Sequence, residues 1–359
     1  MAISAALVDT LTRHQVLIQR LTAGEVAQFS PVLRKIDVLI RAKLSGDELT
    51  AFGRSKLETL LSATERSMAV LQSAFAADLS KAVLEFAQHE AAFSARALTD
   101  TIGFDANVPA ASQVRSAVLA RPLGVRGAGG GKLLDRFVAD WGQSERDAVV
   151  GSIRRGVYEG RTNADLVRDI RGTKARNYAD GVLNTTARHA QAVIHTSVQH
   201  ASSVARNETF QANQDVVVGR RLIATLDSKT TVICRSLDQT VWPLDSGPRS
   251  PLHIACRTTE VPELADDLMA LRQGATRPAV VDGKVQQVPA NEAYYEWLKR
   301  QPMAFIETAI GPTRARLLAN GGLSAERFAA LQLDRNFQPL TLDEMKALEP
   351  LAFQRAGVS

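Results

Sequence analysis

Cysteine, aromatic residues and long apolar runs are all scarce in this chain of 359 residues, which contains only two cysteines. Two cysteines cannot build the disulfide framework of a small secreted domain, so we expect the chain to fold in a reducing cytoplasm. No stretch reaches about 18 uninterrupted apolar residues, and the N-terminus lacks the segments of a secretory signal, so we expect no membrane partner. Aromatic residues make up 5% of the chain, which favours helices packed through alanine and leucine over a large β-sandwich.

Positive charge is concentrated in one part of the chain. Residues 151–260 contain 15 arginines and lysines against 10 acidic residues, so this segment carries the whole net charge of +5. Such a cluster can neutralise the phosphates of double-stranded DNA without reading its sequence, although a solvated helix surface has the same composition. The candidate DNA-binding residues are Arg154, Arg155, Arg161, Arg168, Arg171, Lys174 and Arg176.

The first part of the chain has the periodicity of helices. Within residues 1–100, apolar residues recur about every 3.6 positions, most regularly from 57 to 98, which predicts a helical hairpin or bundle. We expect Pro31 to mark the start of a helix. Residues 101–132 contain two prolines and the glycine run at 127–131, so we predict a linker there.

The middle of the chain, residues 133–263, is predicted to be a helical domain that ends in a small β-rich Cys/His module. A face of small residues indicates a long helix that begins at Asn184 or Thr185 and runs to about Asn213. The apolar segments at 216–226, 232–234 and 240–242 favour strands.

The remaining residues, 264–359, are predicted to form a tail of short elements. Asp282 and Gly283 favour the turn of a two-residue β-hairpin. Ser324 is typical of a helix N-cap, and Thr341 with Glu344 has the pattern of a capping box. The predicted fold class is therefore α+β and predominantly helical.

Both cysteines of the chain lie in one window with a histidine between them. The order is Cys234, His253, Cys256, and Asp227 lies close by in the sequence. Two thiolates, one imidazole and one carboxylate or water would complete a tetrahedral zinc site, so these four residues are the candidate ligands and zinc the candidate cofactor. Three alternatives stay open: two buried thiols beside a structural histidine, a disulfide, and a nucleophilic Cys–His pair, for which no third orienting group is evident.

A longer pattern surrounds this window. Its elements follow one another in this order: IRRGVYEG at 153–160, RHAQAVIHT at 188–196, Asn213, ATLDSKT at 224–230, CRSLD at 234–238, PLHIACR at 251–257 and Pro262. With these elements, residues 148–262 resemble the phage head morphogenesis domain of the Mu F-like minor head proteins. Residues 294–324 also resemble the C-terminal part of many such proteins.

The chain departs from the family pattern at three positions. Ser197 stands where the family often has glutamate, Gln239 where it often has glycine, and Thr258 where it often has a last cysteine. The change at Thr258 removes a potential metal ligand.

The resemblance implies a minor capsid protein of the virion, assembled in the host cytoplasm. Such proteins join the procapsid and associate with the portal protein and other capsid components, and some contact packaged double-stranded DNA or influence its ejection. This implies no catalytic residues and no enzyme. Two other classes stay open from the residues: a metal- or Cys/His-dependent hydrolase of toxin-like type, and a non-specific DNA-binding module.

Overall fold

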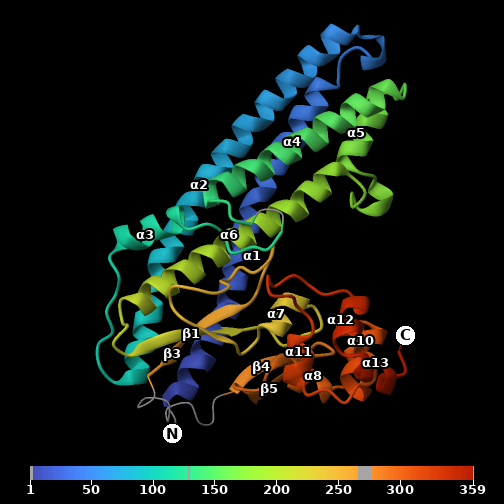
Figure 1. Cartoon of the computed structure of the whole chain (residues 1–359). Helices are drawn as coiled ribbons and strands as arrows, with labels where there is room; N and C mark the ends of the chain where they lie inside the picture. The colour runs from blue at the N-terminus through green and yellow to red at the C-terminus, as the bar shows by residue number, and fades with distance from the viewer. Residues whose placement is uncertain (1–2, 128–129, 266–275, 359) are drawn as a thin grey trace.

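The computed structural model describes residues 3–127, 130–265 and 276–358. Helices account for 63% of the chain and strands for 9%, which confirms the predicted α+β class with a predominance of helix. Long helices form an extended arm, and the strands and short helices lie beside one end of that arm (Figure 1). None of the described helices is long and apolar enough to cross a membrane.

Two very long helices form the predicted hairpin of the arm. Helix α1 (Ile3–Lys43) runs outward, η1 (Leu49–Ala51) makes the turn, and α2 (Arg54–Ile102) returns beside α1. The expectation that Pro31 starts a helix is wrong, because Pro31 lies inside α1. Phe29 and Ile36, on either side of the proline, are buried, and this packing keeps the helix continuous although proline removes one backbone hydrogen bond.

Three further helices pack on the hairpin: α4 (Leu134–Tyr158), α5 (Asn163–Arg171) and α6 (Val182–Gln211). Thr162 caps α5 by accepting a hydrogen bond from the backbone of Asp165. Helix α6 begins at the N-cap Gly181, slightly before the predicted start. Its small-residue face is buried against the core that also contains Phe29, Phe75 and Trp141, so close helix packing places α6 in the middle of the arm.

The segment 101–132 differs from the predicted linker. It contains α3 (Ala111–Ala120), whose Val114 and Val118 are buried in the same core as Leu123 and Val125. Glycine and proline indicate turns, but they do not show whether the residues between those turns are packed. Residues 128–129 of the glycine run lie outside the described residues, and the division of the chain into domains stays a prediction.

The β-rich module is a small antiparallel sheet. Its strands β1 (Val217–Ile223), β2 (Val241–Trp242) and β3 (Thr259–Leu264) lie in the order β2-β1-β3. The predictions of strand around 216–226 and 240–242 are confirmed in part, whereas the prediction at 232–234 is wrong because these residues begin helix α7 (Val232–Ser236). A three-residue apolar run does not distinguish a strand from one buried helical turn.

The C-terminal part forms a second hydrophobic core, to which Leu226 of the preceding module also contributes. Strands β4 (Thr276–Val281) and β5 (Lys284–Pro289) form the predicted hairpin, with positive φ at both Asp282 and Gly283 as a type I′ turn requires. Ser324 and Thr341 cap helices as predicted, while residues 266–275 lie outside the described residues. The helices are α8 (Tyr294–Lys299), α9 (Met303–Ile310), α10 (Pro312–Asn320), α11 (Ala325–Ala330), α12 (Leu342–Leu348) and α13 (Pro350–Ala356).

Candidate functional site

The candidate metal ligands Cys234, His253 and Cys256 lie together. Cys234 is in α7, while His253 and Cys256 are in the loop before β3. Cys234 Sγ lies 3.1 Å from His253 Nε2 and 3.6 Å from Cys256 Sγ, and the three potential ligand atoms are all within 4.8 Å of one another. The grouping predicted from the sequence spacing is therefore present.

The spacing of this Cys–His–Cys cluster fits a metal ion. Two thiolates on a tetrahedral zinc ion, with Zn–S bonds of about 2.3 Å, lie about 3.8 Å apart, close to the 3.6 Å between Cys234 and Cys256. His253 Nδ1 bonds the backbone carbonyl of Ile254 at 2.8 Å, which leaves Nε2 to face the sulfurs, as in metal-ligating histidines. Both cysteines are free thiols, so the cluster can hold a metal.

The pKa values of the two buried thiols are shifted in opposite directions. Burial, and then the neighbouring Cys256, raise the pKa of Cys234 well above its usual range. Burial also acts to raise the pKa of Cys256, but hydrogen bonds from Cys234 and His253 outweigh it and hold the pKa well below its usual range. Burial acts to lower the pKa of His253, but the hydrogen bond and charge of Cys256 outweigh it and raise that pKa. The pKa values of the two thiols are thus shifted in opposite directions, and a metal ion would displace the protons that the ligands carry.

Asp227 does not join the cluster, so its assignment as a fourth ligand is wrong. Its two carboxylate oxygens accept hydrogen bonds from Arg257 at 2.6 and 3.0 Å, and they also bind Thr230 and the backbone of Lys229. Burial acts to raise the pKa of Asp227, but Arg257 outweighs it and holds the pKa below its usual value. The Asp227 carboxylate therefore stabilises the turn that contains it and holds Arg257 in place.

The space beside the cluster is small. A cavity of about 50 Å³ adjoins Cys234 and His253 and is lined by threonines, among them Thr231 and Thr258. Typical organic ligands need pockets of about 300–1,000 Å³, whereas a water needs only about 10–15 Å³. The cavity is therefore large enough for a metal-bound water and smaller than the pockets that bind organic ligands. His253 bonds no carboxylate within the described residues, so the third group of a nucleophilic Cys–His site is not found there.

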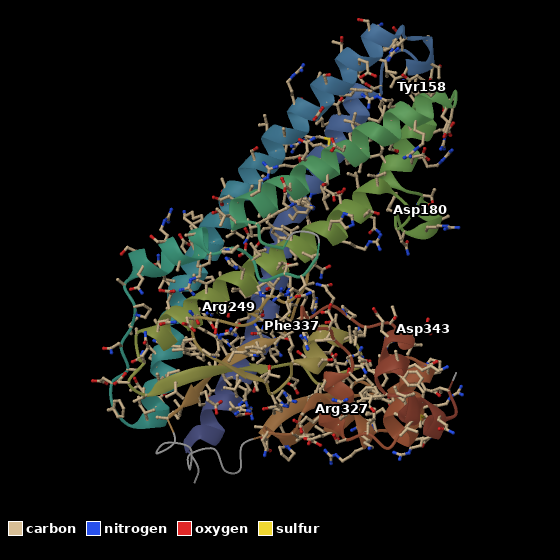
Figure 2. All side chains as sticks on the ribbon, viewed as in Figure 1. Tyr158, Asp180, Arg249, Arg327, Phe337 and Asp343 are labelled. Atoms are coloured by element: carbon tan, nitrogen blue, oxygen red, sulfur yellow. The ribbon has the colours of Figure 1, made fainter. Side chains whose placement is uncertain are left out.

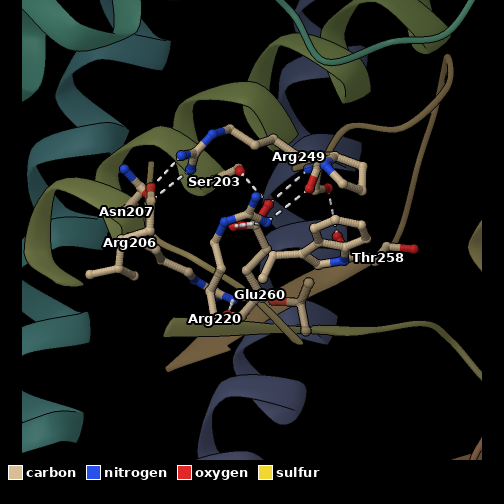
Figure 3. Close-up of polar contacts among 12 residues, drawn as sticks. Ser203, Arg206, Asn207, Arg220, Arg249, Thr258 and Glu260 are labelled. Carbon is tan, nitrogen blue, oxygen red and sulfur yellow. Dashed lines mark hydrogen bonds and ion pairs between the residues drawn. The ribbon is translucent and has the colours of Figure 1, made fainter. Parts of the chain in front are cut away.

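Two buried ionic networks, which the sequence did not reveal, fix the cluster in the fold. In the first, Arg206 of α6 pairs with Glu90 of α2 at 2.5 Å and bonds the carbonyl of Glu260 in β3 at 3.2 Å. The carboxylate of Glu260 also accepts a hydrogen bond from Ser203 of α6 and forms an ion pair with Arg220 of β1 (Figure 3). Because a broken buried pair leaves an uncompensated charge, this network holds the sheet firmly against the arm.

The second network joins the sheet to the C-terminal part. Asp238 accepts hydrogen bonds from the backbone N–H groups of Ala224 and Tyr294, both at 2.8 Å. Arg277 of β4 donates to both oxygens of the Asp238 carboxylate, at 2.9 and 2.5 Å. On the other side of the module, Thr196 Oγ1 accepts from the N–H of Ala255, beside Cys256.

The seven candidate DNA-binding residues lie in the distal half of the arm, on α4, α5, η2 (Lys174–Arg176) and the loop between α4 and α5, but most are ion-paired. The pairs are Arg154 with Glu58, Arg161 with Asp169, Arg168 with Asp165, and Arg171 with Asp37. Across the part of the chain that the structure describes, Arg155, Lys174 and Arg176 have no such partner. The basic surface is therefore reduced to a few free cations at the exposed end of the arm.

Comparison with protein-family models, with curated proteins and with solved structures gives no significant match to this chain.

Proposed function

We propose that this chain is a phage minor head protein that takes part in procapsid assembly at the portal vertex and contacts packaged DNA. The observation that carries the proposal is the convergence of residues from the resembling motif. Thr196, Asp238 and Arg257 come from separate elements of that motif, and each makes a hydrogen bond that positions the Cys–His–Cys cluster or joins its module to a neighbouring part. These motif residues, which are distant in the sequence, thus serve together to build one module.

The role we infer for the module is structural. The cavity beside the cysteines, about 50 Å³, is smaller than the pockets that bind organic ligands. The long arm supplies an extended surface for the portal protein and other capsid components in the virion. Its exposed apolar residues, such as Val38 and Val70, suit contacts with protein partners.

We further propose that the cluster binds one zinc ion through Cys234, His253 and Cys256. Water would take the fourth position, within the cavity that Thr231 and Thr258 line. Their hydroxyl groups are buried and lie beside the Cys234 sulfur, so they can bond that water. The ion would tie α7 to the loop before β3, which stabilises the module as structural zinc sites do.

Metal analysis of the purified protein tests the zinc site. We expect one zinc per chain and its loss in Cys256→Ser. Asp227→Asn is the matched control, because Asp227 lies near the cluster but bonds Arg257, so this variant should keep its zinc. Metal-free protein as purified, which also takes up no added zinc, would contradict the site.

Co-purification tests the proposed place in the particle. Co-expressed with the portal protein of the same genome, the chain should bind it, and mass spectrometry of mature particles should detect the chain. Particles assembled without the chain should fail in packaging or ejection of DNA. Normal packaging and ejection by such particles, or cleavage of DNA or peptide by the purified chain with Zn²⁺ or Mg²⁺, would contradict the proposal.

A further inference from the structure

A compact loop protrudes from the distal half of the arm between α5 and α6, at residues 172–181. The carboxylate of Asp180 accepts hydrogen bonds from the backbone and the hydroxyl of Thr173, at 2.7 and 2.8 Å, and the N–H of Tyr178 bonds the Thr173 carbonyl. Gly181 allows the two ends of the loop to touch, because a Cβ there would clash with the backbone of Arg171. Figure 2 shows Asp180 at this position, away from the body of the molecule.

The loop carries an aromatic residue in an unfavourable backbone conformation. Asn177 and Tyr178 have φ of 48° and 60°, a region that asparagine adopts readily and a bulky residue rarely does. The residue Tyr178 is 39% exposed, and the guanidinium of Arg171 lies 4.8 Å from the ring centroid. Such backbone strain at a partly exposed aromatic residue points to a binding role.

Free positive charge lies in the same loop as this ring. Lys174 and Arg176 are exposed, and neither forms an ion pair with any residue that the structure describes. Asp180 is the one acidic residue of the loop, and its oxygens are engaged in closing it. Arg171 has its nearest carboxylate, that of Asp37, at 3.9 Å. The loop thus combines an aromatic face, a stacked guanidinium and two cations without partners.

We propose that this loop binds single-stranded nucleic acid. An unpaired base stacks on Tyr178, and the flanking phosphates contact Lys174 and Arg176. Bases in a duplex already stack on one another, so a protruding ring reaches only the backbone, whereas every unpaired base offers a free face. The inference rests on the proposed DNA contact and deepens it, because it selects an unpaired segment, such as a DNA end, as the ligand.

Fluorescence anisotropy with the full chain tests the stacking. The probes are oligothymidylate, oligouridylate and a duplex of the same length, each titrated at several salt concentrations. We expect oligothymidylate to bind more tightly than the duplex. Tyr178→Leu should weaken that binding by about 5- to 100-fold with an unchanged salt dependence, while Tyr178→Phe, which keeps the ring, should restore it. Tyr158→Leu is the matched control, because this exposed tyrosine lies on the same arm outside the loop.

The phosphate contacts are tested by the salt dependence of the same binding. Replacing Lys174 or Arg176 by alanine should reduce the slope of log affinity against log salt by about 0.7 each. Arg168→Gln should leave the slope unchanged, because Arg168 already pairs with Asp165. A slope that is equal in all variants would overturn the assignment of these two cations.

The outcomes of these experiments distinguish failure of the stacking site from failure of the proposed DNA contact. Equal affinity for duplex and oligothymidylate, with no effect of Tyr178→Leu, would overturn the stacking site and leave the DNA contact in place. Absence of binding to every probe would overturn both. Clear preference for oligouridylate over oligothymidylate would assign the site to RNA and overturn its link with packaged DNA.

Discussion

Replacement of Asp238 by alanine is expected to destabilise the protein more than any change at an exposed ion pair. Asp238 and Arg277 are both almost completely buried, with side-chain exposures of 0% and 1%. Loss of the carboxylate leaves the Arg277 guanidinium charged and without an anion in the interior. A buried pair broken in this way costs about 3–5 kcal/mol. The cost also includes the backbone N–H groups of Ala224 and Tyr294, which lose their acceptor.

Urea unfolding followed by circular dichroism measures this free energy. Arg168→Ala is the control, because it breaks an exposed pair with Asp165 and should leave the midpoint unchanged. The double variant Asp238→Ala with Arg277→Met should regain part of the lost stability, because it removes the buried cation as well. The reasoning is refuted if Asp238→Ala lowers the free energy of unfolding by less than about 1 kcal/mol, or if the double variant is less stable than the single one.

Three further predictions concern single side chains. Burial lowers the pKa of His200 to about 4, below its unfolded value of about 6.5. The contribution of neutral His200 to the free energy of unfolding is therefore complete above pH 6.5, and that free energy falls by about 3 kcal/mol as the pH drops to 4. His200→Gln should flatten this pH dependence in urea titrations, and an unchanged slope would contradict the prediction. Ile36→Ala should lower the free energy of unfolding by about 2–5 kcal/mol, whereas the exposed Val70→Ala should not, and equal effects would argue against the packing of α1 on α2. Ser324→Ala should lower the free energy of unfolding by about 1 kcal/mol, because it removes the cap of α11. The control Thr308→Ala removes an exposed hydroxyl that bonds its own helix and should have no measurable effect. A larger effect of Thr308→Ala than of Ser324→Ala would disprove the capping assignment.

The Cys–His–Cys cluster was the most predictable part of the candidate site. Cys234, His253 and Cys256 are the rare residues of a short window, and a loop can bring such residues together whatever the rest of the fold does. Asp227 was equally close in sequence, yet its oxygens bond Arg257 instead. Spacing could not reveal this competition, because Arg257 and Asp227 meet only after β3 returns beside β1.

The candidate DNA-binding face shows the same limit more clearly. Composition identified the basic segment, but it could not separate Lys174, which is free, from Arg154, which donates two hydrogen bonds to Glu58. Glu58 is far from Arg154 in the sequence and comes near only because α2 and α4 pack side by side. The sequence alone therefore overestimates the number of arginines and lysines that are free to contact phosphates.

The sequence by itself determined the features that act over a few residues. The helical periodicity of the arm, the hairpin turn at Asp282 and the caps at Ser324 and Thr341 follow from local backbone preferences and near-neighbour hydrogen bonds. Only the tertiary structure decided that Pro31 lies inside a helix and that Asp238 meets Arg277. The physical reason is that ion-pair partners and buried contacts depend on distances between elements, and those distances exist only once the elements have packed.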